Sequence, residues 1–221
     1  INVGSFTESR AYAAAGAAPA LTLDKMANNG TLELTAAATT TTVTMTDATG
    51  TADSFNIVTK VVAAPLSFGT VDVAGVETLK LNAVDTEPTV TAGGVTSASI
   101  QTATLNLKAD KATSLMIEGN SNVTLTLDAT TTKLATIDAG TLTGNLIAGN
   151  SHAGVNTIAM TITGGKGADQ LKASVGTNAK ADVLNGGDGN DTLTGAGGAD
   201  VMYGGRGDDV VVLNKIGRAH V

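Results

Sequence analysis

GGDGNDTLT (residues 186–194), GAGGADVMY (195–203) and GGRGDDVVV (204–212) are three consecutive nine-residue units of one pattern. The pattern is Gly-Gly-x-Gly-x-Asp-x-apolar-x, and Ala196 is the exception at its second place. An upstream copy, GGKGADQLK, covers residues 164–172. A degenerate unit, Thr177–Asn185, keeps Asp182 and Leu184 but has no glycines, and it follows a four-residue insertion at 173–176. Five units in one register are far more specific than an isolated Gly-x-Gly.

The residue types in this pattern have distinct physical roles. Glycine permits tight turns and close approach of the backbone, which leaves carbonyl oxygens directed at one spot. The apolar residue two places after each Asp predicts a short strand that faces inward. All five units have an apolar residue at this place, namely Leu171, Leu184, Leu193, Met202 and Val211. A flexible Gly/Asp-rich linker has no reason to keep this register, so we expect a folded repeat.

The aspartates predict a metal site built from oxygen atoms. Carboxylate and carbonyl oxygens, with no His or Cys in the pattern, favour Ca²⁺ over transition metals. If one unit forms half a coil, a site lies between unit n and unit n+2 on the same edge. That pairing predicts three shared sites: Asp169 with Asp191, Asp182 with Asp200, and Asp191 with Asp209. The site of Asp182 and Asp200 fits the pattern least well, because Lys180 stands where a glycine is expected.

These units resemble the RTX repeats of proteins that Gram-negative bacteria export by type I secretion. The resemblance implies a parallel β-roll that binds several Ca²⁺ ions. It also implies that the carbonyls of the second and fourth places join the Asp side chains as ligands. In this sequence those carbonyls belong to Gly165, Gly167, Gly187, Gly189, Ala196, Gly198, Gly205 and Gly207.

Upstream of residue 164 the sequence predicts β-structure throughout. Apolar residues alternate with Thr or other polar residues, as in Leu32–Thr35, Val43–Thr46 and Leu105–Lys108. Such alternation with β-branched residues is typical of half-buried strands. From about residue 115, strands recur every eight to eleven residues, which suits either a hairpin sandwich or the rungs of a solenoid. We therefore expect an all-β chain in which a Thr-rich β body, either a sandwich or an irregular solenoid, leads into the roll.

Composition divides the chain near residue 164. Thirteen of its 27 glycines and seven of its fifteen aspartates lie in 164–212. We expect a Thr/Ala-rich β domain at 1–163, an RTX calcium-binding roll at 164–212, and a short tail at 213–221. The tail matches nothing upstream and is expected to derive from cloning. The start, Ile1-Asn2-Val3-Gly4, has no initiator Met, so we interpret the chain as a piece of a longer protein.

Composition also argues against several functions. Thirteen basic and twenty acidic residues give a net charge of −7, which disfavours nucleic acid as a partner. No apolar stretch approaches eighteen residues, so we expect no membrane insertion. The chain has two histidines, no cysteine and no His-Glu-x-x-His motif, which argues against a zinc protease.

Two weaker catalytic patterns are present. Gly149–Gly154 nearly forms a Gly-x-Ser-x-Gly motif around Ser151 and His152, but Ala153 breaks it, so a polar turn is the simpler interpretation. Asp24, Asp128 and Asp138 offer paired carboxylates for a glycosidase, but nothing selects two of them over turn-capping aspartates. We expect no enzymatic activity.

Two functional hypotheses are left. In the first, the chain is part of a surface-layer protein on the outside of a Gram-negative cell, where Ca²⁺ orders it and copies self-associate into a lattice. Cell-surface polysaccharide is a further expected partner. In the second, it is a calcium-stabilised module of an RTX adhesin or secreted effector that binds a glycan or a host surface. The scarcity of aromatic residues (2 %) argues against glycan stacking and favours the lattice.

Overall fold

The computed structural model describes residues 20–62, 64–87, 91–92, 95–96, 100–149, 158–173 and 180–213, with backbone alone at 91–92 and 95–96. Within these ranges the chain forms strands and turns and no helix, as the alternating pattern predicts. Accordingly, no helix in the described ranges could cross a bilayer.

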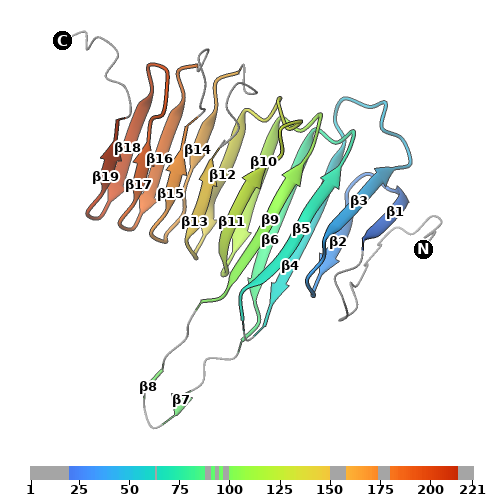
Figure 1. Cartoon of the computed structure of the whole chain (residues 1–221), viewed down its shortest axis with the longest axis horizontal. Coiled ribbons are helices and arrows are strands. Elements are labelled where there is room, and N and C mark those ends of the chain that lie inside the picture. Colours follow the sequence, from blue (N-terminus) through green and yellow to red (C-terminus); the bar gives the residue numbers. More distant parts are fainter. Residues whose placement is uncertain are drawn as a thin grey trace.

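Two long parallel sheets face each other along the whole molecule (Figure 1). The chain passes from one sheet to the other and back, and each full circuit is one coil of a β-solenoid. The nine-stranded sheet consists, in spatial order, of β1 (Leu21–Met26), β3 (Thr40–Met45), β5 (Leu66–Val73), β9 (Thr102–Lys108), β11 (Asn122–Leu127), β13 (Leu146–Gly149), β15 (Gln170–Lys172), β17 (Thr192–Thr194) and β19 (Val210–Val212).

The eight-stranded sheet runs in the same direction along the molecule. It consists of β2 (Gly30–Leu34), β4 (Ser54–Val61), β6 (Thr78–Asp85), β10 (Ser114–Gly119), β12 (Thr136–Leu142), β14 (Thr161–Thr163), β16 (Val183–Asp188) and β18 (Val201–Arg206). A two-stranded antiparallel pair, β7 (Thr91–Ala92) and β8 (Val95–Thr96), projects from the connection between β6 and β9 (Figure 1). The first and last strands, β1 and β19, lie at opposite ends of the solenoid (Figure 1).

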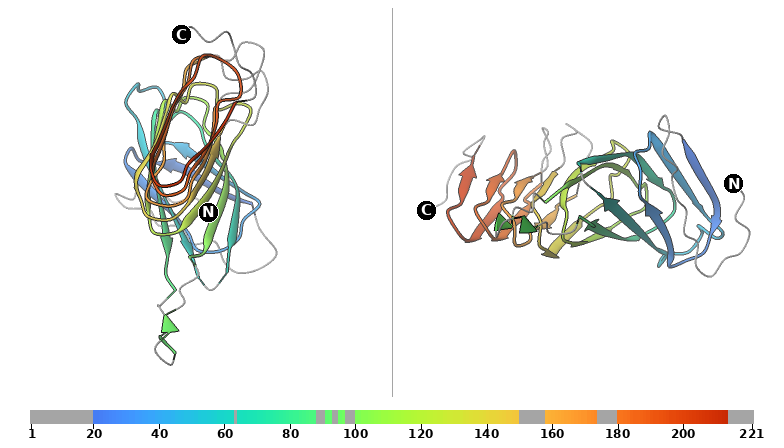
Figure 2. Two further views of the ribbon diagram at one scale, coloured as in Figure 1. Left: turned by 90° about the vertical axis from the view of Figure 1, so that its left-hand side faces the viewer. Right: turned by 90° about the horizontal axis from the view of Figure 1, so that it is seen from below.

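Parallel pairing decides between the two architectures that the sequence left open. A sandwich of hairpins would pair consecutive strands antiparallel, whereas here β1 pairs with β3 and β2 pairs with β4, both in parallel. Rungs were expected only from about residue 115, but the winding already begins at Leu21. It continues through residue 164 without a change of strand order, so the Thr-rich body and the repeats share both sheets. Seen end-on, the C-terminal coils superimpose as a flattened loop (Figure 2, left).

The core is a single apolar layer between the two sheets. In β10, for example, Leu115 and Ile117 are buried, while Met116 between them is exposed. The inward positions of the repeats continue this layer, since Leu171, Leu184 and Leu193 are fully buried. The alternation in the sequence therefore identifies the buried face correctly, because successive side chains of a strand point to opposite faces.

The neighbours Leu115 and Met116 test this core. Leu115→Ala leaves a cavity between two rigid sheets, so we expect the free energy of unfolding to fall by about 2–5 kcal/mol. Met116→Ala removes a side chain that is 45 % exposed, so it should change the free energy of unfolding by about 0.5 kcal/mol or less. Urea denaturation followed by circular dichroism measures both values. Equal losses from the two variants would contradict the assignment of faces.

Candidate metal centre

Each predicted aspartate stands directly before a strand, at what we call the pre-strand position. Asp169, Asp191 and Asp209 precede β15, β17 and β19 of one sheet, and Asp182 and Asp200 precede β16 and β18 of the other. Strand pairing aligns Leu171 with Leu193 and Leu193 with Val211, so the aspartates stack from coil to coil along each edge. The apolar residue two places later anchors the register where it enters the core, as Leu171, Leu184 and Leu193 do. In the last described coil the expected burial is not reached, since Met202 is partly buried and Val211 is exposed.

The structure brings together the three aspartate pairs that the sequence predicts. In each pair the backbone N–H of one aspartate donates to Oδ1 of the aspartate in the next coil. The nitrogen–oxygen distances are 2.8 Å from Asp169 to Asp191, 3.0 Å from Asp182 to Asp200 and 3.0 Å from Asp191 to Asp209. The last two pairs are 18 residues apart, which is two nine-residue units. The first pair is 22 residues apart, because the four-residue insertion lies between its members.

The same contact joins the repeats to the β body. Leu146 N–H donates to Asp169 Oδ1 at 2.6 Å, and Met160 N–H donates to Asp182 Oδ1 at 2.7 Å. Asp169 Oδ2 also accepts from Gly165 N–H at 2.6 Å. The first aspartate on each edge therefore holds a main-chain amide of the preceding coil, which has no nine-residue pattern of its own.

Three of these carboxyl groups are buried, and main-chain amides donate to each of them. Asp169, Asp182 and Asp191 are all buried, and Asp191 Oδ2 has no hydrogen-bond partner. Burial raises the pKa of Asp169 to about 6. The charge of Asp191 raises this pKa a little further, whereas the two backbone hydrogen bonds from Leu146 and Gly165 oppose the rise. Burial likewise raises the pKa of Asp191 and of Asp200, with nearby carboxylates adding to it. A stack of ionised aspartates is therefore unfavourable unless a cation neutralises it.

Glycines bring carbonyl oxygens close to this stack. Gly189 and Gly207, at the fourth place of their units, have φ of +124° and +129°. A Cβ at Gly189 would collide with the carbonyl oxygen of Gly167, and one at Gly207 with that of Gly189. Only glycine allows both the backbone conformation and this close approach.

Four of the eight carbonyls that the resemblance implies lie against the following coil. They belong to Gly165, Gly167, Gly187 and Gly189, and each faces a glycine of the next unit on its edge. The other four belong to the last described coil on their edge, so no described coil lies beyond them. These are the carbonyls of Ala196, Gly198, Gly205 and Gly207.

The sequence predicted that Lys180, standing where a glycine is expected, would weaken the site of Asp182 and Asp200, but its main chain takes the same position as that of a glycine. Its carbonyl oxygen faces Gly198 just as the Gly167 carbonyl faces Gly189. The main chain supplies this oxygen whatever the side chain is, so a sequence signal based on glycine misses it. Sequence reasoning also passed over Gly186 and Gly204, the first residues of their units. A Cβ at either would collide with Oδ2 of the aspartate in its own unit, Asp191 or Asp209.

The donor set fits Ca²⁺. All the groups named are carboxylate or carbonyl oxygens, which hard cations prefer. Among the described residues, no three His, Cys, Asp or Glu side chains come together as a metal cluster, so main-chain oxygens must complete any site. When bound, the ion supplies the positive charge that the stacked carboxylates lack. The chain's own residues hold the carboxylates in line through their amide hydrogen bonds.

The carboxylates suggested for a glycosidase do not come together. Asp24 lies on β1 and Asp138 on β12, in different sheets. Each of the three accepts a short-range or neighbouring-strand hydrogen bond. Thr44 Oγ1 donates to Asp24 at 3.0 Å, the N–H of Thr130 to Asp128 at 3.0 Å and the N–H of Gly140 to Asp138 at 3.0 Å. Ser151 and His152 of the near-match at 149–154 lie outside the described residues.

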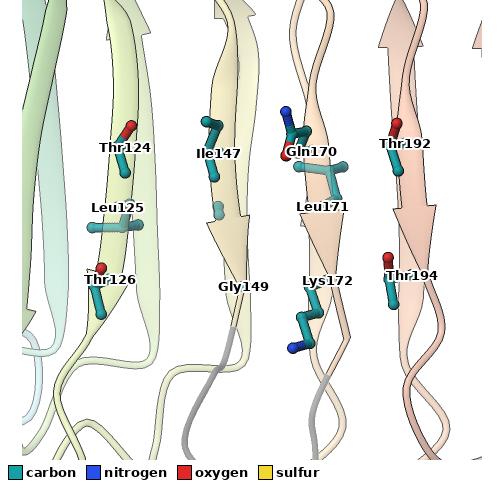
Figure 3. A pocket seen from close by; sticks show the side chains of 11 residues that line it. Thr124, Leu125, Thr126, Ile147, Gly149, Gln170, Leu171, Lys172, Thr192 and Thr194 are labelled. Atoms are coloured by element: carbon teal, nitrogen blue, oxygen red, sulfur yellow. The ribbon is translucent and has the colours of Figure 1, made fainter. Parts of the chain in front are cut away.

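A shallow groove of about 290 Å³ crosses the outer face of the nine-stranded sheet (Figure 3). Four neighbouring strands line it, and its polar side chains come from three of them, β11, β15 and β17. These include Thr124, Thr126, Gln170, Lys172 and Thr192. Gly149 leaves the floor open, since a Cβ there would lie 2.6 Å from that of Lys172. No aromatic ring lines the groove.

The raised pKa of Asp169 predicts how the calcium-free protein responds to pH. Its folded pKa of about 6 exceeds the ordinary value of 3.8, so the folded state binds the proton more tightly. In EGTA, the melting temperature of the wild type should therefore rise relative to that of Asp169→Asn as pH falls from 7 toward 4. With Ca²⁺ the trend should reverse, because the ion needs the ionised carboxylate. Parallel melting curves for the two proteins in EGTA would contradict the assignment.

Asp191 contacts an aspartate in both directions, so its charge should matter most for bound calcium. We expect Asp191→Asn to lose about two ions per chain and Asp169→Asn about one, as measured by equilibrium dialysis. Asp188→Asn, an exposed position in the same unit, is the matched control and should lose none. A larger loss from Asp169→Asn would show that the pairing of unit n with unit n+2 is wrong.

Comparison with known families agrees with this geometry. The model of the RTX calcium-binding nonapeptide repeat, which spans four copies, matches residues 161–179 and 176–211. No curated protein matches the chain. The matched residues contain every predicted aspartate and both edges of the stack. The C-terminal coils, residues 161–211, are thus RTX calcium-binding nonapeptide repeats.

Proposed function

We propose that the chain is a calcium-dependent structural module of a secreted cell-surface protein of the surface-layer type. In this proposal the chain leaves a Gram-negative cell by type I secretion, folds outside on binding Ca²⁺, and self-associates into a lattice. The observation that carries it is the stack of aspartates whose carboxylates accept main-chain N–H groups from coil to coil. Such a stack needs a cation to fold, and RTX repeats bind Ca²⁺.

The charge on the stack links folding to the compartment. Where Ca²⁺ is scarce, ionised aspartates repel one another and are costly to bury, which favours the unfolded chain. Extracellular calcium modules bind with Kd on the order of 10⁻⁴ to 10⁻³ M, so the ion is available to them outside the cell. Binding free energy then adds to folding free energy. This supports export as an unfolded chain and folding after export.

Two features of the surface support a structural role with self-association. Outward positions of the sheets are mostly Thr, Asn, Ser and paired charges, such as Lys108 with Asp72 at 2.7 Å. The last described strands differ, because β18 and β19 leave large apolar side chains exposed. Tyr203 and Val210 are 59 % and 54 % exposed. Exposed apolar side chains at a sheet edge are typical of surfaces that pair with another chain.

A second function is favoured by the groove on the nine-stranded sheet. Its threonine hydroxyls, Gln170 and Lys172 could hydrogen-bond to a sugar, as in an RTX adhesin or effector that binds a glycan or a host surface. The absence of an aromatic ring in the lining deprives a sugar of its usual stacking surface. The lattice is therefore the stronger proposal.

Electron microscopy of the purified protein tests the two functions. On addition of millimolar Ca²⁺ we expect ordered two-dimensional sheets that disperse in EGTA. A double variant, Asp191→Asn with Asp209→Asn, should form none, whereas the control Asp188→Asn should assemble like the wild type. Soluble monomers that bind glycan would favour the adhesin. Sheets that form equally well in EGTA would contradict a calcium-dependent lattice.

A further inference from the structure

Two acidic residues of the β body occupy the same structural position as the repeat aspartates. Asp53 stands directly before β4 and Glu77 directly before β6, just as Asp182 and Asp200 stand before β16 and β18 of the same sheet. Strand pairing aligns Ser54 with Thr78, so Asp53 and Glu77 are neighbours in consecutive coils. Neither residue belongs to a nine-residue unit, and both lie far outside the matched range of 161–211.

The hydrogen bonds of this pair match those of the repeats. Asp53 N–H donates to Glu77 Oε2 at 2.9 Å, as Asp182 N–H donates to Asp200 Oδ1 at 3.0 Å. The return contact also matches, because Thr78 N–H donates to the Asp53 carbonyl at 3.0 Å. In the repeats, Val201 N–H donates to the Asp182 carbonyl at 2.8 Å. The two corners therefore share one main-chain arrangement despite different sequences.

Asp53 also has an oxygen without a partner. The residue is 7 % exposed, and its Oδ1 accepts from Asn28 Nδ2 at 3.1 Å, while its Oδ2 accepts no hydrogen bond. In the described part of the chain, the only other buried carboxylate oxygen in this state is Asp191 Oδ2, in the repeat stack. A buried carboxylate oxygen without a partner costs free energy unless a proton or a cation reaches it.

The position beside Asp53 Oδ2 is occupied by a glycine, which has no side chain. This residue is Gly50, where a Cβ would be 2.7 Å from Oδ2. Glycine beside the free Oδ2 is a further similarity to the repeats, where Gly186 lies beside Asp191 Oδ2.

We propose that Asp53 and Glu77 form a further Ca²⁺ site in the β body, outside the RTX repeats. Two carboxylates with main-chain and water oxygens make a donor set that favours Ca²⁺ over transition metals. The ion would bind at the corner between two coils, where β4 and β6 begin, and would order the loop at 47–53. This site does not depend on lattice assembly, so it extends the role of calcium beyond the proposed function.

Hydrogen–deuterium exchange of the full chain, followed by mass spectrometry, tests this site directly. On addition of Ca²⁺ we expect slower exchange in two separate segments, one spanning 47–60 and the other 186–212. In the double variant Asp191→Asn with Asp209→Asn, the segment at 47–60 should keep its calcium-dependent protection while that at 186–212 loses it. Calcium-independent exchange at 47–60 in the wild type would overturn the proposal, even if the repeats respond and the proposed function holds.

Three variants then assign the ligand. Asp53→Asn should lose the protection at 47–60 and about one bound ion per chain, while 186–212 still responds. Gly50→Ala removes no charge but fills the space beside Oδ2, so it should weaken the same response. Asp138→Asn, an exposed acid on the same sheet, is the matched control and should change neither segment. If Asp53→Asn folds and binds as much Ca²⁺ as the control, the proposal is wrong.

Discussion

A hydrogen bond between coils is the contact on which this molecule depends. At the pre-strand position, the backbone N–H of one coil donates to the acidic side chain of the next. Five such bonds tie the repeats together and to the body before them. The bonds run from Leu146 to Asp169, Met160 to Asp182, Asp169 to Asp191, Asp182 to Asp200 and Asp191 to Asp209. Buried amides must find an acceptor, and at these corners a parallel strand offers none. The carboxylate satisfies the amide and brings a negative charge into the interior.

That charge explains why the C-terminal coils differ from the rest. In the Thr-rich body, long strands such as β4 and β6 bury enough apolar surface between the sheets to hold the coils together. In the repeats, β15, β17 and β19 have three residues; β15 and β17 each bury one large side chain, and β19 buries none. A thinner core leaves more of the stability to the metal. Under the proposed function, we therefore expect calcium binding and folding to be most strongly coupled in the shortest coils.

The strength of the sequence signal varies with the physical role of each residue. Leu184 and Leu193 were predictable as core residues, because an apolar residue recurs at their place in every unit and a large apolar side chain is most stable when buried. The aspartate pairs were predictable once a unit was taken as half a coil. The carbonyl of Lys180 was not, since any residue supplies a main-chain oxygen. Likewise, Ala196 adopts a φ of 53°, which its side chain gives no reason to expect.

By itself, the sequence determined an all-β chain, the register of the nine-residue units, and the preference of their oxygens for calcium. These follow from local chemistry, namely side-chain alternation, glycine turns and hard anionic ligands. The tertiary structure decided that the Thr-rich body is a solenoid, because strand direction depends on how distant segments pair. It also decided that Asp53 and Glu77 meet as the repeat aspartates do. Residues 24 positions apart become neighbours only when two coils are stacked, and no local pattern marks them.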